Sequence, residues 1–207
     1  MTDHYLEFED KNGILQGYTL YPPPDRRCCP DGERGLSLAQ ARTAVSFHEA
    51  GHAVVGIAAG IDPRDIEITQ GPPCTGCDVV GFGGRNIGVV FGNANLADAL
   101  TVLAAGVQAE LLWLTREDLL TPARGWAAEA GGIGDQAFAQ EVAGAWGSNL
   151  DYTESPVNLP GNYRWRQRDA LLVLADRWPQ VTAVAAALAE HGFLSSAEVS
   201  RLARPLG

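Results

Sequence analysis

The sequence lacks an apolar run long enough to cross a membrane. A spanning helix needs about 20 mostly apolar residues, and the best stretch, residues 96–114, contains Asp98, Gln108 and Glu110. The first ten residues, MTDHYLEFED, are polar and acidic and lack the apolar segment of a signal peptide. These two absences predict a cytoplasmic protein with no membrane span.

Positive charge is also scarce. The chain has 15 Lys and Arg residues against 25 Asp and Glu residues, which gives a formal net charge of −10. An acidic chain is poorly suited to grip a phosphate backbone, so nucleic acid is excluded as a main partner. A GxxxxGK[ST] phosphate loop is missing as well, and the glycine run GFGGRNIG contains no lysine. The printed residues therefore give no support to ATP-driven chemistry.

What the sequence does contain is typical of one globular domain with an appendage, since it has 207 residues and is 46% apolar. We expect the appendage at residues 1–35. It would comprise a β-hairpin over residues 4–21, turning at DKNG, and the proline-rich linker YPPPDRRCCPDGERG. The main domain is expected at residues 36–207.

Within the main domain the pattern favours a mainly α fold of the α+β class. A helix is expected at residues 37–59, capped by Ser37, beside a small sheet made by strands 65–69 and 78–84. The other expected helices lie at residues 94–114, 136–145, 171–188 with a kink or break at Pro179, and 195–202. Residues 115–132 and 148–162 are expected to be irregular.

The first helix carries the sequence HEAGH. His48 and His52 are four residues apart, so both side chains lie on one helix face and can bind one metal ion. Glu49 follows the first histidine, which places its carboxylate beside the ion as a general base rather than on it as a ligand. The alternative is an ordinary helix that carries two histidines.

A zinc site needs at least a third ligand. The HExxH motif is not extended by a nearby histidine, and His191 is the only histidine downstream. Carboxylates are therefore the candidates. Glu110 lies on an apolar helix and Asp135 at the expected start of another.

Four blocks, in this order, resemble the peptidase domain of the FtsH-type ATP-dependent zinc metalloproteases, the M41 peptidases. TAVSFHEAGHAVVG resembles the family's zinc helix, AAGVQAELL its AGRxAEE helix, and GGIGDQAFAQEVA its GASNDxxxAxxIA segment. The stretch from ALLVLADRW to EVSRL resembles its closing helices. Together the blocks span about residues 36–203.

The resemblance implies an FtsH peptidase-like zincin domain that binds Zn²⁺ through His48, His52 and Asp135, with Glu49 as base. Asp135 would otherwise be a helix cap. Glu110 matches a glutamate that would orient a ligand histidine, although a buried glutamate with a local partner is an equal alternative.

The chain also departs from the family. FtsH proteins carry a membrane anchor and an ATPase before the peptidase domain, and the printed residues contain neither. The connection from Glu110 to Asp135 is longer than usual and contains Trp126, and residues 1–35 have no counterpart. The resemblance therefore supports the chemistry but not ATP-driven unfolding by this chain.

We expect a zinc metalloendopeptidase acting on peptides or unfolded polypeptides. Zincins commonly hold an extended peptide against a strand edge, and Ile66, Glu67 and Ile68 form our candidate edge. A separate ATPase or regulatory protein is a candidate partner, and a monomer or small oligomer is expected. The alternatives are a catalytically silent or partner-gated peptide-binding module, and a zinc hydrolase of non-peptide amides.

The four cysteines suggest a second metal site. Cys74 and Cys77 form a CxxC at the expected turn between two strands, which is a zinc-knuckle spacing, whereas Cys28 and Cys29 are adjacent. If the N-terminal segment folds back, the four would form a structural zinc site that pins it across the cleft entrance. Free thiols and a disulfide are the alternatives.

Overall fold

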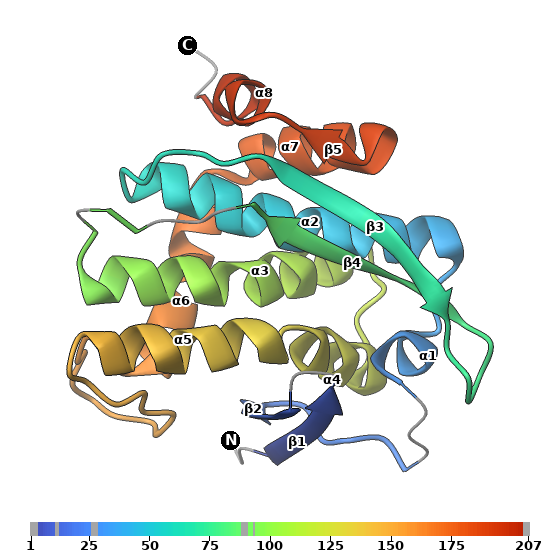
Figure 1. Ribbon diagram of the computed structural model, residues 1–207, viewed down its shortest axis with the longest axis horizontal. Helices are drawn as coiled ribbons and strands as arrows, with labels where there is room; N and C mark the ends of the chain where they lie inside the picture. Colours follow the sequence, from blue (N-terminus) through green and yellow to red (C-terminus); the bar gives the residue numbers. More distant parts are fainter. Residues whose placement is uncertain (1–3, 11–12, 26–28, 88–90, 93, 205–207) are drawn as a thin grey trace.

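The computed structural model describes residues 4–10, 13–25, 29–87, 91–92 and 94–204 (Figure 1). These residues are mainly helical, with small antiparallel sheets, which confirms the expected α+β class. The helices are α1 Pro30–Arg34, α2 Leu38–Ala58, α3 Leu96–Arg116, α4 Pro122–Gly131, α5 Ile133–Ala145, α6 Tyr163–Asp176, α7 Trp178–His191 and α8 Ser196–Leu202. The strands are β1 His4–Asp10, β2 Gly13–Thr19, β3 Ile66–Pro73, β4 Val80–Asn86 and β5 Phe193–Leu194.

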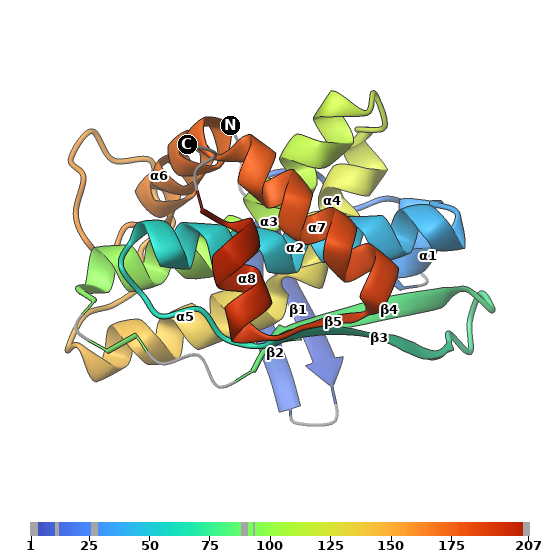
Figure 2. The same ribbon diagram turned by 90° about the horizontal axis from the view of Figure 1, so that it is seen from above.

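Helices α2 and α3 lie side by side at the centre of the molecule, with α5 beyond α3 and the β3–β4 hairpin across α2 (Figures 1 and 2). Ser37 begins α2 through a capping box with Gln40. Gly51 lets the two helices approach closely, because a Cβ there would lie 2.7 Å from the carbonyl oxygen of Ala105. This close approach brings the HEAGH face of α2 against α3.

Helix α3 is long and apolar enough to resemble a membrane span. Among the described residues it is the one unbroken helix that meets this test, and 72% of its most apolar window is buried inside the protein. Its apolar side chains therefore form the main core together with those of α2, α6 and α7.

The larger sheet has the strand order β4-β3-β5, and this order overturns one expectation. Ile66 and Glu67 pair with β4 on one side and with β5 on the other, and the N–H of Ile68 donates to the carbonyl of Gly192 at 2.9 Å. Residues 66–68 therefore cannot be a free substrate edge. The open edge on the α2 side belongs to β4.

The N-terminal hairpin forms as expected, with β1 and β2 antiparallel. It rests on α5, because the Gln136 side chain exchanges hydrogen bonds with the backbone N–H and carbonyl of Tyr18. The buried Glu129 of α4 accepts from the N–H groups of Leu20 and Tyr21. The side chains of Gln136 and Glu129, both buried, thus fix the position of the N-terminal hairpin on α5 and α4.

Two segments expected to be irregular contain helices. The segment of residues 21–35 includes α1, and that of residues 115–132 includes α4. Helix α4 begins at the Thr121 cap with Pro122 in its first turn, and it buries Trp126 almost completely. The expected helix at residues 136–145 begins earlier, at Ile133, so Asp135 lies in the first turn and is not the cap.

The C-terminal region has the expected break near Pro179 and the expected last helix, but α6 begins at Tyr163 rather than near residue 171, and β5 was not expected. Helices α6 and α7 are bent by 86° at the break next to Pro179, and α8 begins with a capping box between Ser195 and Glu198. Residues 148–162 form no helix or named strand. Helix α7 packs on α2 at the side away from α5, and α6 passes behind α3 (Figure 1).

Candidate metal centre

The histidines of α2 and an aspartate of α5 bring three possible ligand atoms together. His48, His52 and Asp135 each offer one ligand atom, and these atoms all lie within 4.8 Å of one another. Asp135 Oδ2 is 2.9 Å from His48 Nε2 and 3.4 Å from His52 Nε2, and the two Nε2 atoms are 3.1 Å apart. These residues can hold a metal ion, with two nitrogen donors and one oxygen donor.

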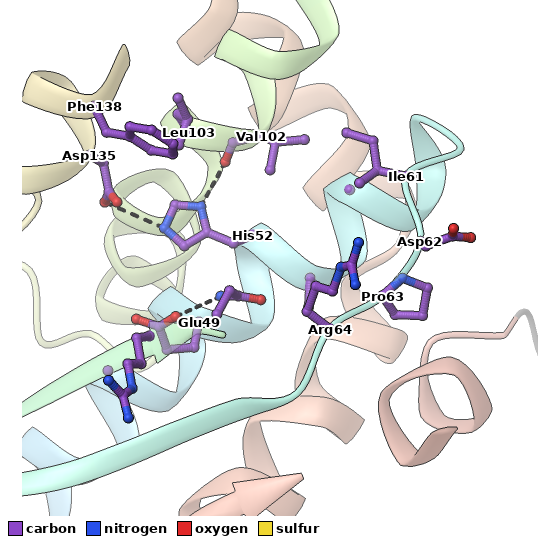
Figure 3. Close-up of a pocket in the computed structure, with 15 residues that line it drawn as sticks. Glu49, His52, Ile61, Asp62, Pro63, Arg64, Val102, Leu103, Asp135 and Phe138 are labelled. Carbon is purple, nitrogen blue, oxygen red and sulfur yellow. Dashed lines mark hydrogen bonds and ion pairs between the residues drawn. The ribbon is translucent and has the colours of Figure 1, made fainter. Parts of the chain in front are cut away.

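His52 is oriented by the backbone of α3. Its Nδ1 lies 2.7 Å from the carbonyl oxygen of Val102, which can only accept a hydrogen bond, so Nδ1 carries a proton. In a neutral imidazole this leaves the lone pair on Nε2, which faces Asp135 (Figure 3). A backbone acceptor behind a ligand histidine is the usual way in which proteins fix the metal-binding tautomer.

His48 is held from behind by a carboxylate. Glu110 Oε2 lies 3.7 Å from His48 Nδ1, and Glu110 Oε1 lies 3.3 Å from Arg34 Nη2. Glu110 is almost completely buried. It therefore acts on His48 from the side opposite Asp135, where it can orient the ring.

The electrostatics favour a positive charge at the centre. Burial alone would lower the pKa of His48, but the carboxylates of Asp135 and Glu110 outweigh burial and raise it to about 10. Burial would raise the pKa of Asp135, yet His52 and His48 hold it well below its usual range. A bound divalent cation would satisfy the same carboxylates in place of the imidazole protons.

Glu49 lies beside the three ligand atoms but outside their set. Its buried carboxylate accepts a hydrogen bond of 2.6 Å from the side-chain amide of Asn86 on β4. Burial raises the pKa of Glu49, although His48 opposes this effect. A buried carboxylate with a raised pKa, next to a cation site, is suited to act as a general acid or base.

Glycines on two elements keep space around these groups. A Cβ on Gly106 of α3 would meet Nε2 of both His48 and His52, the atoms that face the metal position. A Cβ on Gly84 of β4 would lie 2.5 Å from Glu49 Cγ. Both positions therefore require the absence of a side chain.

Two cavities flank Glu49 and meet at Gly84 and Asp135. One, of about 300 Å³, is lined by apolar side chains that include Ile61, Leu103 and Phe138 (Figure 3). The other, of about 420 Å³, is lined by charged groups that include Asp31, Arg34 and Glu110. A cleft thus follows the open edge of β4, with the candidate metal centre at its middle.

Five of the site residues named from the sequence come together here, namely His48, Glu49, His52, Glu110 and Asp135. Cys29, Cys74 and Cys77 form a separate cluster, and Cys28 lies outside the described residues. Asn86 and Arg34 were missed. Neither carried a sequence signal, because a polar residue at a strand end and an arginine in a proline-rich segment are both common on protein surfaces.

Comparison with known proteins gives no independent assignment. No protein-family model matches the chain, and no curated protein matches it significantly. The interpretation of this centre therefore depends on its geometry and chemistry.

Proposed function

We propose that the protein is a zinc metallopeptidase of the M41 type. The observation that carries the proposal is the convergence of His48, His52 and Asp135 on one point, with the Glu49 carboxylate beside it. Three protein ligands with a cavity open beside them are the usual arrangement of catalytic zinc sites, whereas most structural zinc sites have four protein ligands. The motif resemblance supports the same assignment.

The donor set fits zinc. Two imidazoles and one carboxylate are common zinc ligands, and a magnesium or calcium site would be built almost entirely from oxygen. When bound, zinc supplies a Lewis acid that brings the pKa of a coordinated water to about 7. The protein's part is to fix three donors and leave the fourth direction open towards the cleft.

Glu49 is the proposed catalytic acid–base. Its carboxylate takes the proton from the attacking water and later gives it to the leaving amine. Asn86 donates to one carboxylate oxygen, so it restricts the rotation of the side chain and leaves the other oxygen for the water. Burial keeps bulk water from competing for this carboxylate.

The substrate is proposed to bind in extended form along β4. The N–H of Ile87 donates to Asp65 at 2.8 Å, and antiparallel pairs alternate, so the backbone groups of Gly84 and Asn86 point away from β3. A peptide can pair with these groups as an added strand. The apolar cavity beside Phe138 would then take an apolar side chain of the substrate.

A peptide that binds as an added strand is recognised mainly through its backbone and less through its side chains. The proposed substrates are therefore peptides and unfolded segments. Folded proteins would need a separate unfolding partner. The test is cleavage of casein after the metal is removed with a chelator and restored with zinc. Activity that disappears with the metal and returns with zinc supports the proposal, and chelator-resistant activity contradicts it.

A further inference from the structure

Cys29 meets the closely spaced Cys74 and Cys77 at the tip of the β3–β4 hairpin. Cys29, Cys74 and Cys77 lie with their sulfur atoms within 4.8 Å of one another, and none of the three is in a disulfide. We propose that these three thiols bind a second zinc ion, with water as its fourth ligand, and that this ion fastens α1 to the hairpin. This site is separate from the metal centre on α2.

The hairpin half of this cluster has the shape of a metal knuckle. The carbonyl of Cys74 accepts from the N–H of Cys77 at 3.4 Å and of Asp78 at 2.8 Å, and the N–H of Cys74 donates to Val79 at 2.8 Å. These bonds close a tight turn, in which Asp78 adopts a left-handed φ of 55°. A CxxC in such a turn presents both sulfurs to one point.

Cys29 supplies the third sulfur from the other side. It caps α1, its Sγ accepts from the N–H of Gly32 at 3.3 Å, and its Sγ lies 3.6 Å from that of Cys77. Two thiolates on one tetrahedral zinc, with Zn–S bonds of about 2.3 Å, are about 3.8 Å apart. The observed spacing therefore matches shared ligation and is far longer than the S–S bond of about 2.05 Å in a disulfide.

Thiolates select zinc among the common cellular divalent cations, while carboxylate and carbonyl oxygens select magnesium and calcium. A Cys₃ set also differs in chemistry from the His₂Asp set of the other centre. The two sites can therefore be distinguished by spectroscopy as well as by mutation.

The position of the cluster suggests what the ion does. Helix α1 has only five residues, too few to be stable alone. In the structure, the Asp31 side chain of α1 nevertheless contacts Gly81 of β4. Arg34 of α1 forms an ion pair with Glu110, whose carboxylate also lies beside His48. An ion at Cys29 would hold α1 in this place, as one wall of the charged cavity.

The test is a titration with Co²⁺ in the Glu49→Gln variant, which removes self-cleavage. Cobalt bound to thiolates gives an intense thiolate-to-metal charge-transfer absorption, and cobalt bound to His₂Asp does not. We expect two metal equivalents per chain and this absorption. Adding Cys77→Ser should remove one metal equivalent together with the charge-transfer absorption. Adding His52→Ala should remove one metal equivalent and leave the absorption. The control Thr75→Ser, in the same turn as Cys77, should change neither the metal content nor the absorption.

A second measurement does not depend on folding of the cysteine and histidine variants. Titration of the zinc-loaded Glu49→Gln protein with an organomercurial should release one zinc per chain as the thiols react. The proposal is overturned if no charge-transfer band appears, if the band survives Cys77→Ser unchanged, or if the mercurial releases no zinc. These results leave the peptidase proposal intact, because that proposal is tested by activity at the other centre.

Discussion

Glu49 and Asn86 form the pair of residues on which the proposed chemistry depends most. Asn86 comes from a strand 37 residues away, and its amide is 2.6 Å from the Glu49 carboxylate. Glu49 is buried and Asn86 is half-buried on the wall of the cleft. The pairing is explained if Glu49 must be held ready for a proton transfer.

Replacement of Asn86 by alanine should lower kcat about 10- to 100-fold with zinc content unchanged, because a hydrogen bond to a charged group contributes about 1.5–3 kcal/mol. The measurement is peptide hydrolysis with metal analysis. Thr69→Ala, an exposed change on β3, serves as the control. An Asn86→Ala enzyme with full kcat would show that this contact has no part in catalysis.

Gly106 should tolerate no side chain. An alanine methyl there would press on Nε2 of both histidines, so Gly106→Ala should weaken zinc binding by at least about tenfold, as displaced supporting groups do. Competition with a chelator measures this affinity. Gly144→Ala, also in a helix but with open space around it, should leave zinc binding unchanged, and equal effects of the two changes would contradict the account.

At the residue scale, the sequence predicted which side chains lie together when they share one helix, but not when they are far apart in the chain. His48, Glu49 and His52 share one helix, so their spacing alone predicted their relative positions. Asp135 is 87 residues from His48 and was placed by motif resemblance, not by spacing. Asn86 could not be found in either way, because its partner is fixed only by the packing of β4 on α2.

Among the elements, β4 is proposed to be the substrate edge that the sequence analysis assigned to β3. The two residues of β5 pair with β3 and cover its second edge. A strand this short gives no periodic signal, so the order of the sheet could not be read from the sequence. Helix α4 did carry a signal, the Thr-Pro start at residues 121 and 122, which the neighbouring glycines and charges obscured.

The proposed edge can be tested with peptides in which single amides are replaced by esters. Each ester removes one N–H donor, so replacements that face β4 should raise KM about threefold to tenfold, as expected for one lost hydrogen bond. Replacements at alternate positions should have little effect. A uniform response along the peptide would argue against binding as an added strand.

At the scale of the whole molecule, the candidate metal centre joins elements that are far apart in the sequence. The candidate ligands come from α2 and α5, and Glu110 and Arg34 extend the contacts to α3 and α1. An ion that binds only the folded state must therefore stabilise the fold as a whole.

Zinc at 100 times its dissociation constant should stabilise the protein by about 2.7 kcal/mol at this site, or about 5–10 °C in Tm for a chain of this size. The Glu49→Gln protein should show this increase between chelator and zinc in thermal unfolding. In Glu49→Gln/His52→Ala the increase should be smaller by that amount. An equal increase in both proteins would place the stabilising ion elsewhere.

The most direct test of the central claim is casein cleavage by the zinc-loaded protein beside its Glu49→Gln variant, with zinc content measured in both. The account predicts that both proteins hold zinc at His48, His52 and Asp135 and that only the wild type cleaves, with the variant slower by about 10²-fold or more. Equal cleavage by both proteins, or no cleavage by a fully zinc-loaded wild type, would contradict it.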